Sequence, residues 1–300
     1  MNPDSEVMLD ALELTEVTPE VFDRAFEATT GYCPWPKAYG GDMVATASLA
    51  AMRTVPDKHL HSSHSYFMRP VDIGATVRYE VEVLRDGRGY ATRQVRAFQN
   101  GKPVFCMLAS FASGGDGPEF ASAMPERMTP PEELPSSAQY LADAPGHEDA
   151  VDPHHTRNAV DYWSYGRSFD MRHVPGPLYL RVEGEQVPHQ GVWIKAFQPL
   201  GDDEQVHRAA LAYACDYTII EPTLRALGIS WSDAGLVTAS LDHAMWFHRP
   251  ARVDEWLLYA QESVAANDQR GLGKGRFFTR DGQLVATVLQ EALIKPGTPA

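Results

Sequence analysis

The chain has 300 residues, 44% of them hydrophobic, and its 40 acidic and 26 basic side chains give a formal net charge of -14. This length suits about two domains of roughly 150 residues, and the apolar fraction is sufficient for each to bury a core. The acidic balance argues against nucleic acid or an anionic membrane as a partner attracted by charge, although a few local arginines would suffice to bind a small phosphorylated molecule.

The beginning of the chain predicts two short strands followed by one buried helix. Apolar stretches at 12–17 and 21–26 indicate the strands. Residues 43–52, MVATASLAAM, carry small or apolar side chains on all sides, which favours a helix that is buried nearly all round. Gly40-Gly41-Asp42 directly before them fits a helix N-terminus.

Antiparallel strands are predicted to follow this helix. In residues 76–84, Val and Tyr alternate with charged side chains, which is the period of a strand with one buried face. Dipeptides that tolerate positive φ predict the hairpin turns between the next strands. The turns are Asp86-Gly87 and Asn100-Gly101, and the strands are 90–99 and 103–112.

Residues 114–160 differ in character, because prolines recur there among Gly, Glu and Asp. We expect a connection between two domains that runs over the surface, with a short helix near 130–142. Opening strands are then predicted again, at 168–173 and 192–197.

The second half continues with one long helix and closing strands. Residues 205–227 form an Ala- and Leu-rich helical pattern that contains Asp216. The glycine-rich run 271–275 has the wrong spacing for a nucleotide-binding loop and is interpreted as a turn. The closing strands are predicted at 238–247, 256–263, 273–279 and 284–294, with Asp281-Gly282 as the last hairpin turn.

One sequence pattern occurs twice. Residues 63–70, SHSYFMRP, are echoed by residues 242–250, DHAMWFHRP, and the two Arg-Pro pairs lie 249 − 69 = 180 residues apart. A repeat of this length indicates a duplicated domain, since solenoid repeats span only a few tens of residues.

These elements together predict an α+β protein made of two hot-dog domains in tandem. A helix that is apolar all round must be wrapped, and a curved antiparallel sheet with one apolar face can wrap it. We expect the two sheets to join edge to edge, which protects one edge of each. The expected domains are 1–115 and 166–300, with 116–165 as the linker and the catalytic residues in the second domain.

The chain ends and the cysteines favour a cytoplasmic protein. The N-terminus is acidic and lacks the apolar segment of a signal peptide, the C-terminal residues are not a peroxisomal address, and no apolar run reaches the ~18 residues of a membrane span. Cys33, Cys106 and Cys215 are scattered without zinc-ligand spacing. We expect reduced thiols and no bound metal.

Several motifs resemble acyl-CoA thioesterase II, over both halves and most weakly between 114 and 165. In the first half they are HSSHSYFMRP at 61–70, LRDG at 84–87 with Thr92-Arg93, and QNGKP at 99–103. In the second half they are YACD at 213–216, ASLDHAMWFHRP at 239–250, DEWLLY at 254–259 and Gln290-Glu291. The resemblance implies hydrolysis of fatty acyl-CoA to free CoA and a fatty acid without a cofactor, in a homodimer or higher homo-oligomer.

The resemblance also implies a site in which Asp, Thr and Gln hold the attacking water. The Asp falls on Asp216 and the Gln on Gln290, whereas the Thr falls on Ser240, a departure that keeps the hydroxyl but loses the methyl group that restricts its rotamer. Thioester hydrolysis needs a proton acceptor for water and donors for the oxyanion. We interpret Asp216 as the base, with a backbone N–H at a helix start for the oxyanion; direct attack by Asp216 through an anhydride is the alternative.

Other side chains fit chemistry less well. His59, His61 and His64 lack acidic or Cys partners at ligand spacing and are interpreted as structural, and a triad of Ser240 with Asp242-His243 is disfavoured because strand neighbours face opposite sides. Arginines that could meet CoA phosphates are interpreted as structural or solvated. They are Arg69, Arg85, Arg93, Arg249 and Arg270.

Two other functions compete with thioester hydrolysis. One is a non-catalytic acyl-CoA binding protein, which Ser240 in place of Thr would favour. The other is an enoyl-CoA hydratase, which is disfavoured because no hydratase motif accompanies Asp42. The repeat places Leu60 opposite Ser240 and Ala109 opposite Gln290, so we predict one catalytic trio per chain. The first half would supply the other wall of the cleft, including residues 40–42.

Overall fold

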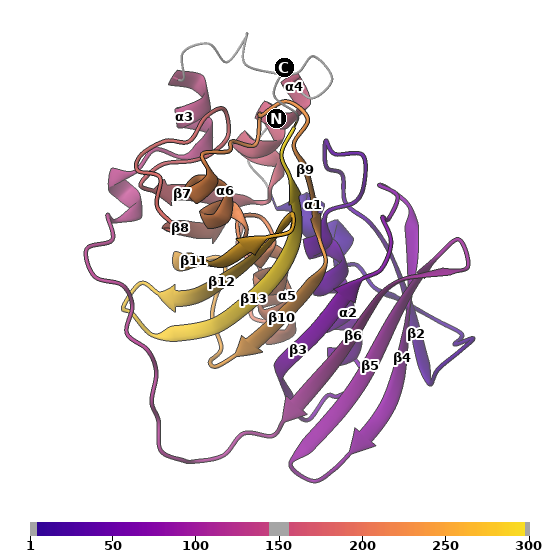
Figure 1. The fold of residues 1–300 in the computed structure, drawn as a ribbon. Helices are drawn as coiled ribbons and strands as arrows, with labels where there is room; N and C mark the ends of the chain where they lie inside the picture. The colour runs from indigo at the N-terminus through magenta and orange to yellow at the C-terminus, as the bar shows by residue number, and fades with distance from the viewer. Residues whose placement is uncertain (1–4, 144–155, 298–300) are drawn as a thin grey trace.

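The computed structural model describes residues 5–143 and 156–297. Figure 1 shows one curved sheet that runs through both halves of the chain. All its pairings are antiparallel, and its 13 strands follow the order β1-β2-β4-β5-β6-β3-β10-β13-β12-β11-β8-β7, with β9 paired to β13 beside this path.

The first half carries two helices and six strands in the described residues. Its elements are α1 (Glu6–Ala11), β1 (Thr15–Val17), β2 (Arg24–Thr29), α2 (Gly40–Met52), β3 (His59–Phe67), β4 (Thr76–Asp86), β5 (Tyr90–Gln99) and β6 (Lys102–Ala112). Asn100 and Gly101 both adopt positive φ between β5 and β6, which confirms that predicted turn. Helix α1 was not predicted, and β1 and β2 lie a few residues later than the expected strands.

The remainder begins with short helical segments and then repeats the strand plan. Its elements are η1 (Pro131–Glu133), α3 (Ser137–Asp143), α4 (Thr156–Asp161), η2 (Tyr162–Gly166), β7 (Phe169–Val174), β8 (His189–Ala196), α5 (Glu204–Cys215), α6 (Glu221–Leu227), β9 (Val237–Ser240), β10 (Asp242–Phe247), β11 (Leu257–Asn267), β12 (Arg270–Thr279) and β13 (Leu284–Lys295). The expected helix near 130–142 corresponds to η1 and α3. The middle of the predicted linker, 144–155, lies outside the described residues, and the predicted domain boundaries stay predictions.

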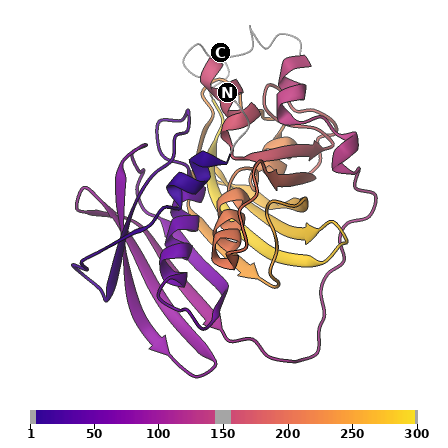
Figure 2. The same cartoon turned by 180° about the vertical axis from the view of Figure 1, so that it is seen from behind.

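The two halves join through their backbones, as predicted. Strand β3 pairs antiparallel with β10, from Ser62 opposite Trp246 to Tyr66 opposite Asp242. In Figure 2, α2 and α5 lie side by side on the inner side of the sheet. Every residue of α2 after Gly40 is buried, which confirms the helix expected from its small apolar side chains. No helix in the described ranges is long and apolar enough to span a bilayer.

The single long helix predicted at 205–227 is wrong, because the chain breaks it in two. Helix α5 ends at Cys215, and α6 begins at Glu221. The cause is Pro222, whose ring would clash with the carbonyl four residues earlier and which has no N–H to donate. The break places Asp216 at the end of α5, where its side chain is free of the helix.

The glycine-rich run predicted as a turn is also not a turn. It lies within β12, and the hairpin turn before it is formed by Asp268 and Gln269, both with positive φ. These glycines give room to the segment after α5, because a Cβ on Gly273 would lie 2.3 Å from the carbonyl oxygen of Ile219. The face of β12 without side chains at its glycines therefore lets the turn after α5, which carries Asp216, pack closely against this strand.

Candidate active site

A cavity of about 520 Å³ lies where the start of α2 meets the second half. The first half contributes residues 35–40, and the second half contributes the segment after α5, the loop before β9, and β13. Its wall is mainly aromatic and apolar, with a few polar groups. The lining side chains used below are Trp35, Lys37, Gly40, Tyr162, Trp163, Arg167, Asp216, Tyr217, Trp231, Leu236, Ser240 and Gln290.

The three residues singled out from the sequence meet in this cavity. Ser240 Oγ donates to Asp216 Oδ1 over 3.0 Å, and Gln290 Nε2 donates to the same oxygen over 2.5 Å. Gln290 Nε2 also donates to Ser240 Oγ over 3.0 Å. The three side chains thus form a closed hydrogen-bonded triangle in which one carboxylate oxygen accepts two donors.

A β-bulge brings Ser240 into this triangle. Ser240 pairs with Ala292 on β13 and Ala244 pairs with Leu289, so the β9–β10 side carries one more residue than β13 over the same interval. On an unbroken strand, Ser240 and His243 would point to opposite faces. The extra residue turns both side chains toward Gln290.

His243 fixes the orientation of the Gln290 side chain through a hydrogen bond to its amide oxygen. Its Nδ1 lies 2.8 Å from Gln290 Oε1, an acceptor, so Nδ1 carries the proton and donates it. Burial lowers the pKa of His243, which keeps the ring neutral, and its other nitrogen lies 3.5 Å from Cys215 Sγ. With its oxygen bound to His243, the Gln290 amide must present its nitrogen to Asp216 and Ser240.

The start of α2 lies against the other oxygen of Asp216. A Cβ on Gly40 would stand 2.6 Å from Asp216 Oδ2, so only glycine permits this approach. The positive end of the α2 dipole therefore faces the Asp216 side chain. Lys37 Nζ, on the loop before α2, donates to the carbonyl of Thr238 over 3.1 Å. Burial lowers the pKa of Lys37, and the charge of Asp216 opposes that effect.

Asp42, which we expected in the cavity wall with Gly40, is not there. Residues two apart on a helix point about 200° away from each other, so the Asp42 side chain faces the core instead. Its Oδ2 accepts a hydrogen bond from the Gly31 N–H over 2.8 Å, and its Oδ1 is buried without a partner among the described residues. Burial raises the pKa of Asp42 to about 7.

The histidines near β3 have structural partners. His61 Nε2 lies 2.9 Å from Ser110 Oγ, His59 Nδ1 lies 3.2 Å from Glu204, and the His64 ring meets Trp246 edge to face. The five arginines considered for CoA phosphates do not line the cavity in the described part of the chain. Arg93, Arg249 and Arg270 form ion pairs with Asp86, Glu119 and Glu291.

Comparison with known proteins decides the family. A profile described as acyl-CoA thioesterase matches residues 165–293, and one described as acyl-CoA thioesterase N-terminal domain matches residues 32–112. Human acyl-coenzyme A thioesterase 8 is 36% identical over 272 residues, covering 88% of this chain and 82% of that protein. Acyl-CoA thioesterase 2 of Haemophilus influenzae is 30% identical over 295 residues, 97% of this chain and 99% of that protein. The chain belongs to the acyl-CoA thioesterase II family.

Solved structures place this thioesterase among hot-dog proteins. Acyl-CoA thioesterase II TesB2 of Mycobacterium marinum is 34% identical, with a TM-score of 0.74 over 96% of this chain and 98% of that one. A hot-dog protein of unknown function from Alicyclobacillus acidocaldarius, 19% identical, has a TM-score of 0.72 over 97% of this chain and 98% of that one, and shows the fold alone. The predicted fold is confirmed. As a family member the chain is a thioester hydrolase, so the hydratase and the non-catalytic alternatives are not supported.

Two residues of this candidate site were missed in the sequence. His243 was considered only as part of a serine triad, because its contact with Gln290 depends on a bulge that the strand pattern does not reveal. Lys37 lies in a turn-rich segment, where nothing in the sequence indicates what it faces. The sequence could not predict the contacts of these two residues, because they depend on which strands and loops become neighbours in space.

Proposed function

We propose that this thioesterase hydrolyses fatty acyl-CoA to free CoA and a fatty acid, with a water molecule activated by Asp216. The observation that carries the proposal is the triangle of Asp216, Ser240 and Gln290 in the cavity wall. A carboxylate with one oxygen held by two donors has a fixed orientation, which a general base requires. The family membership supports acyl-CoA as the substrate.

In the proposed reaction, Asp216 Oδ2 accepts a proton from the water while the water oxygen attacks the thioester carbonyl carbon. Ser240 and Gln290 orient the carboxylate and the water. The carbonyl oxygen becomes an oxyanion, and an N–H at the start of α2, where Gly40 approaches Asp216, would donate to it. When the C–S bond breaks, the CoA thiolate leaves and takes up the proton from Asp216, and the acyl group departs as a fatty acid.

The cavity wall suits an apolar acyl chain. Trp35, Tyr162, Trp231 and Leu236 surround the space next to the triangle. Aromatic and aliphatic walls with a few polar groups at one point are typical of sites that bind a largely apolar ligand. The acyl chain of the substrate would lie among these side chains, while its thioester reaches Asp216.

The decisive experiment compares the wild type with Asp216→Asn in the release of free thiol from a panel of acyl-CoAs. Loss of a general base typically lowers kcat by about 10²- to 10⁴-fold. Asn keeps the size of Asp and the acceptor for Ser240 and Gln290, so acyl-CoA binding should persist, measured as quenching of tryptophan fluorescence. The control is Asp281→Asn, because Asp281 lies in the exposed turn between β12 and β13, away from the cavity. Full activity of Asp216→Asn would overturn the assignment of the base.

A further inference from the structure

Three buried donors in the wall of the same cavity have no carboxylate or carbonyl acceptor among the described residues. Trp163 Nε1 and Arg167 Nε have no hydrogen-bond partner among the described residues, and the hydroxyl of Tyr217 meets only the hydroxyls of its neighbours Tyr162 and Tyr213. All three side chains line the cavity and are at most 5% exposed. A buried donor without a good acceptor is unfavourable, and most polar groups of this fold are satisfied, so this group of donors in one wall points to a ligand that accepts from them.

The charge of Arg167 also lacks a dedicated counter-ion. No described carboxylate forms an ion pair with it, and the one polar contact that it makes in the described part of the chain is from Nη1 to Met171 Sδ at 3.8 Å. Glu221 is the anion whose charge it feels, but the carboxylate of Glu221 is already in use.

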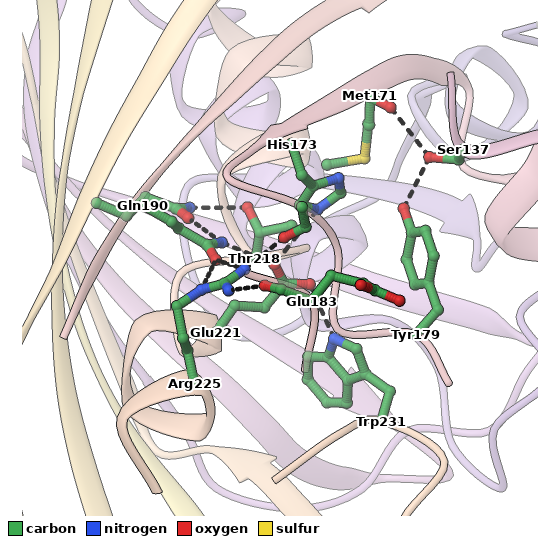
Figure 3. A network of polar contacts seen from close by, with 12 residues as sticks. Ser137, Met171, His173, Tyr179, Glu183, Gln190, Thr218, Glu221, Arg225 and Trp231 are labelled. Carbon is green, nitrogen blue, oxygen red and sulfur yellow. Dashed lines mark hydrogen bonds and ion pairs between the residues drawn. The ribbon is translucent and has the colours of Figure 1, made fainter. Parts of the chain in front are cut away.

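Figure 3 shows the side chains that contact the carboxylate of Glu221. Trp231 Nε1 donates to Oε1 over 2.8 Å, and Gln190 Nε2 donates to Oε2 over 2.7 Å. His173 Nε2 lies 3.3 Å from Oε2. Arg225, the other buried arginine in this region, bonds to Gln190 and to two backbone carbonyls. The network satisfies Glu221 and Arg225 within itself, and Arg167 remains outside it.

The surroundings of Arg167 hold its guanidinium in place. Its Cζ lies 5.1 Å from the ring centre of Tyr217 and 5.5 Å from that of Tyr179. Trp163 stacks on Tyr179 with ring centres 5.0 Å apart. A planar cation fixed between aromatic rings is organised before a ligand arrives, which lowers the entropic cost of binding. Because Tyr217 follows Asp216 in the chain, this group of donors borders the catalytic triangle.

We propose that Trp163, Arg167 and Tyr217 form a subsite for a carboxylate at the far end of the acyl group, so that the enzyme favours thioesters of dicarboxylic acids. The proposal rests on the proposed function. A guanidinium, an indole N–H and a phenol O–H can donate together to the two oxygens of one carboxylate. The phosphates of CoA carry the same chemistry, but the nearly complete burial of these side chains in an aromatic wall favours the smaller group on a slender chain.

The test is a set of length-matched substrate pairs: succinyl- and butyryl-CoA, adipoyl- and hexanoyl-CoA, suberoyl- and octanoyl-CoA, and sebacoyl- and decanoyl-CoA. For each pair the readout is the ratio of kcat/KM between the ω-carboxyl and the plain acyl-CoA. A hydrogen bond to a charged group contributes about 1.5–3 kcal/mol, so Arg167→Met should lower the ratio by about tenfold or more for the preferred length. Arg280→Met is the matched control, since Arg280 is exposed and pairs with Glu132.

Trp163→Phe and Tyr217→Phe make the test independent of any damage to folding by Arg167→Met. Each removes one donor and keeps the ring, and each should lower the ratio by several-fold. Binding of free adipate against hexanoate, followed by tryptophan fluorescence, should show the same preference without turnover. Unchanged ratios in all three variants would overturn the subsite, and so would equal losses on both members of each pair, which would assign the donors to CoA. Absence of any thioester hydrolysis by the wild type would contradict the proposed function instead, while the binding preference would still be measurable.

Discussion

The described parts of the two halves share a scaffold that includes one β-bulge in each, yet the hydrogen-bonded triangle of Asp216, Ser240 and Gln290 is found only in the second half. In the first half, β3 has one extra residue opposite β6 between Leu60 and Ser62. In the second half, the extra residue lies at the corresponding place, between Ser240 and Ala244. The duplication therefore copied the bulge that makes the triangle possible.

The difference lies in the side chains at that bulge. The positions that match His243 and Gln290 in the repeat are Ser63 and Ala109, which pair with each other on β3 and β6. Neither side chain is long enough to reach a carboxylate, and the buried hydroxyl of Ser63 has no hydrogen-bond partner within 5–143 and 156–297. The bulge thus sets the direction in which the side chains point. Their length and their hydrogen-bond donors come from His243 and Gln290, which stand where the first half has Ser63 and Ala109.

The central helices α2 and α5 meet the cavity with opposite ends. Helix α2 brings its N-terminus to the cavity, and α5 brings its C-terminus with Asp216. The acidic residue of α2, Asp42, faces the core instead. Each half therefore contributes one end of its central helix, and the site needs both.

Among the changes that give the second half a residue of the first, the largest effect is expected when Gln290 is replaced by Ala. Gln290→Ala removes the donor to both Asp216 and Ser240, and loss of a comparable site donor costs about 10²-fold in kcat. Steady-state kinetics with one preferred acyl-CoA would measure it. Ala109→Ser, a change on the inner face of β6, is the matched control. A Gln290→Ala enzyme with wild-type kcat would remove Gln290 from the site.

Replacing His243 in the same way should have a smaller effect. His243→Ser leaves Gln290 without its anchor, and one lost hydrogen bond of about 1–1.5 kcal/mol corresponds to about tenfold in kcat. Because His243 acts through Gln290, the double variant should lose no more than Gln290→Ala alone. Additive losses in this cycle would show that His243 acts independently of Gln290.

Asp42 faces the core, whereas Asp216 lines the cavity. A change at Asp42 should therefore alter the free energy of unfolding without loss of hydrolysis. The pKa of Asp42 is raised by burial to about 7, so the folded state keeps a proton that the unfolded state loses. Its contribution to stability is complete below the ordinary carboxyl pKa and is lost as the pH rises toward about 7. Asp42→Asn should remove this loss and stabilise the protein by about 1–3 kcal/mol at pH 8. Urea unfolding at pH 4 and pH 8 measures it, and the same mutational effect at both values would refute it.

The smallest effect is expected where the chain departs from its family. Ser240→Thr restores the family residue, and its methyl group restricts the rotamer of the hydroxyl that donates to Asp216. We expect kcat to change by less than about threefold, because one rotamer preference is worth only a fraction of a kcal/mol to about one. Ser240→Ala, which removes the hydroxyl, should lose about tenfold. Equal activity of the Thr and Ala variants would show that the hydroxyl has no role.

What the sequence could reveal depended on how local each feature is. The buried helix α2 and the alternating β4 follow from residue patterns within a few turns of chain, and Asp216, Ser240 and Gln290 followed from family motifs. The break at Pro222 was also local and was overlooked inside an otherwise helical pattern. The bulge at Ser240 and the role of His243 depend on the register with β13, which is set between residues far apart in the chain.

Because β3 and β10 share a ladder of backbone hydrogen bonds, the two halves behave mechanically as one piece. Opening them like a hinge would break that ladder and separate α2 from α5, at a cost far above thermal energy. A long acyl chain would then enter and leave past the loops at 35–39 and 231–236, which line the cavity. Turnover on long substrates would be limited by these loops, and its rate should respond to solvent viscosity more than turnover on short ones.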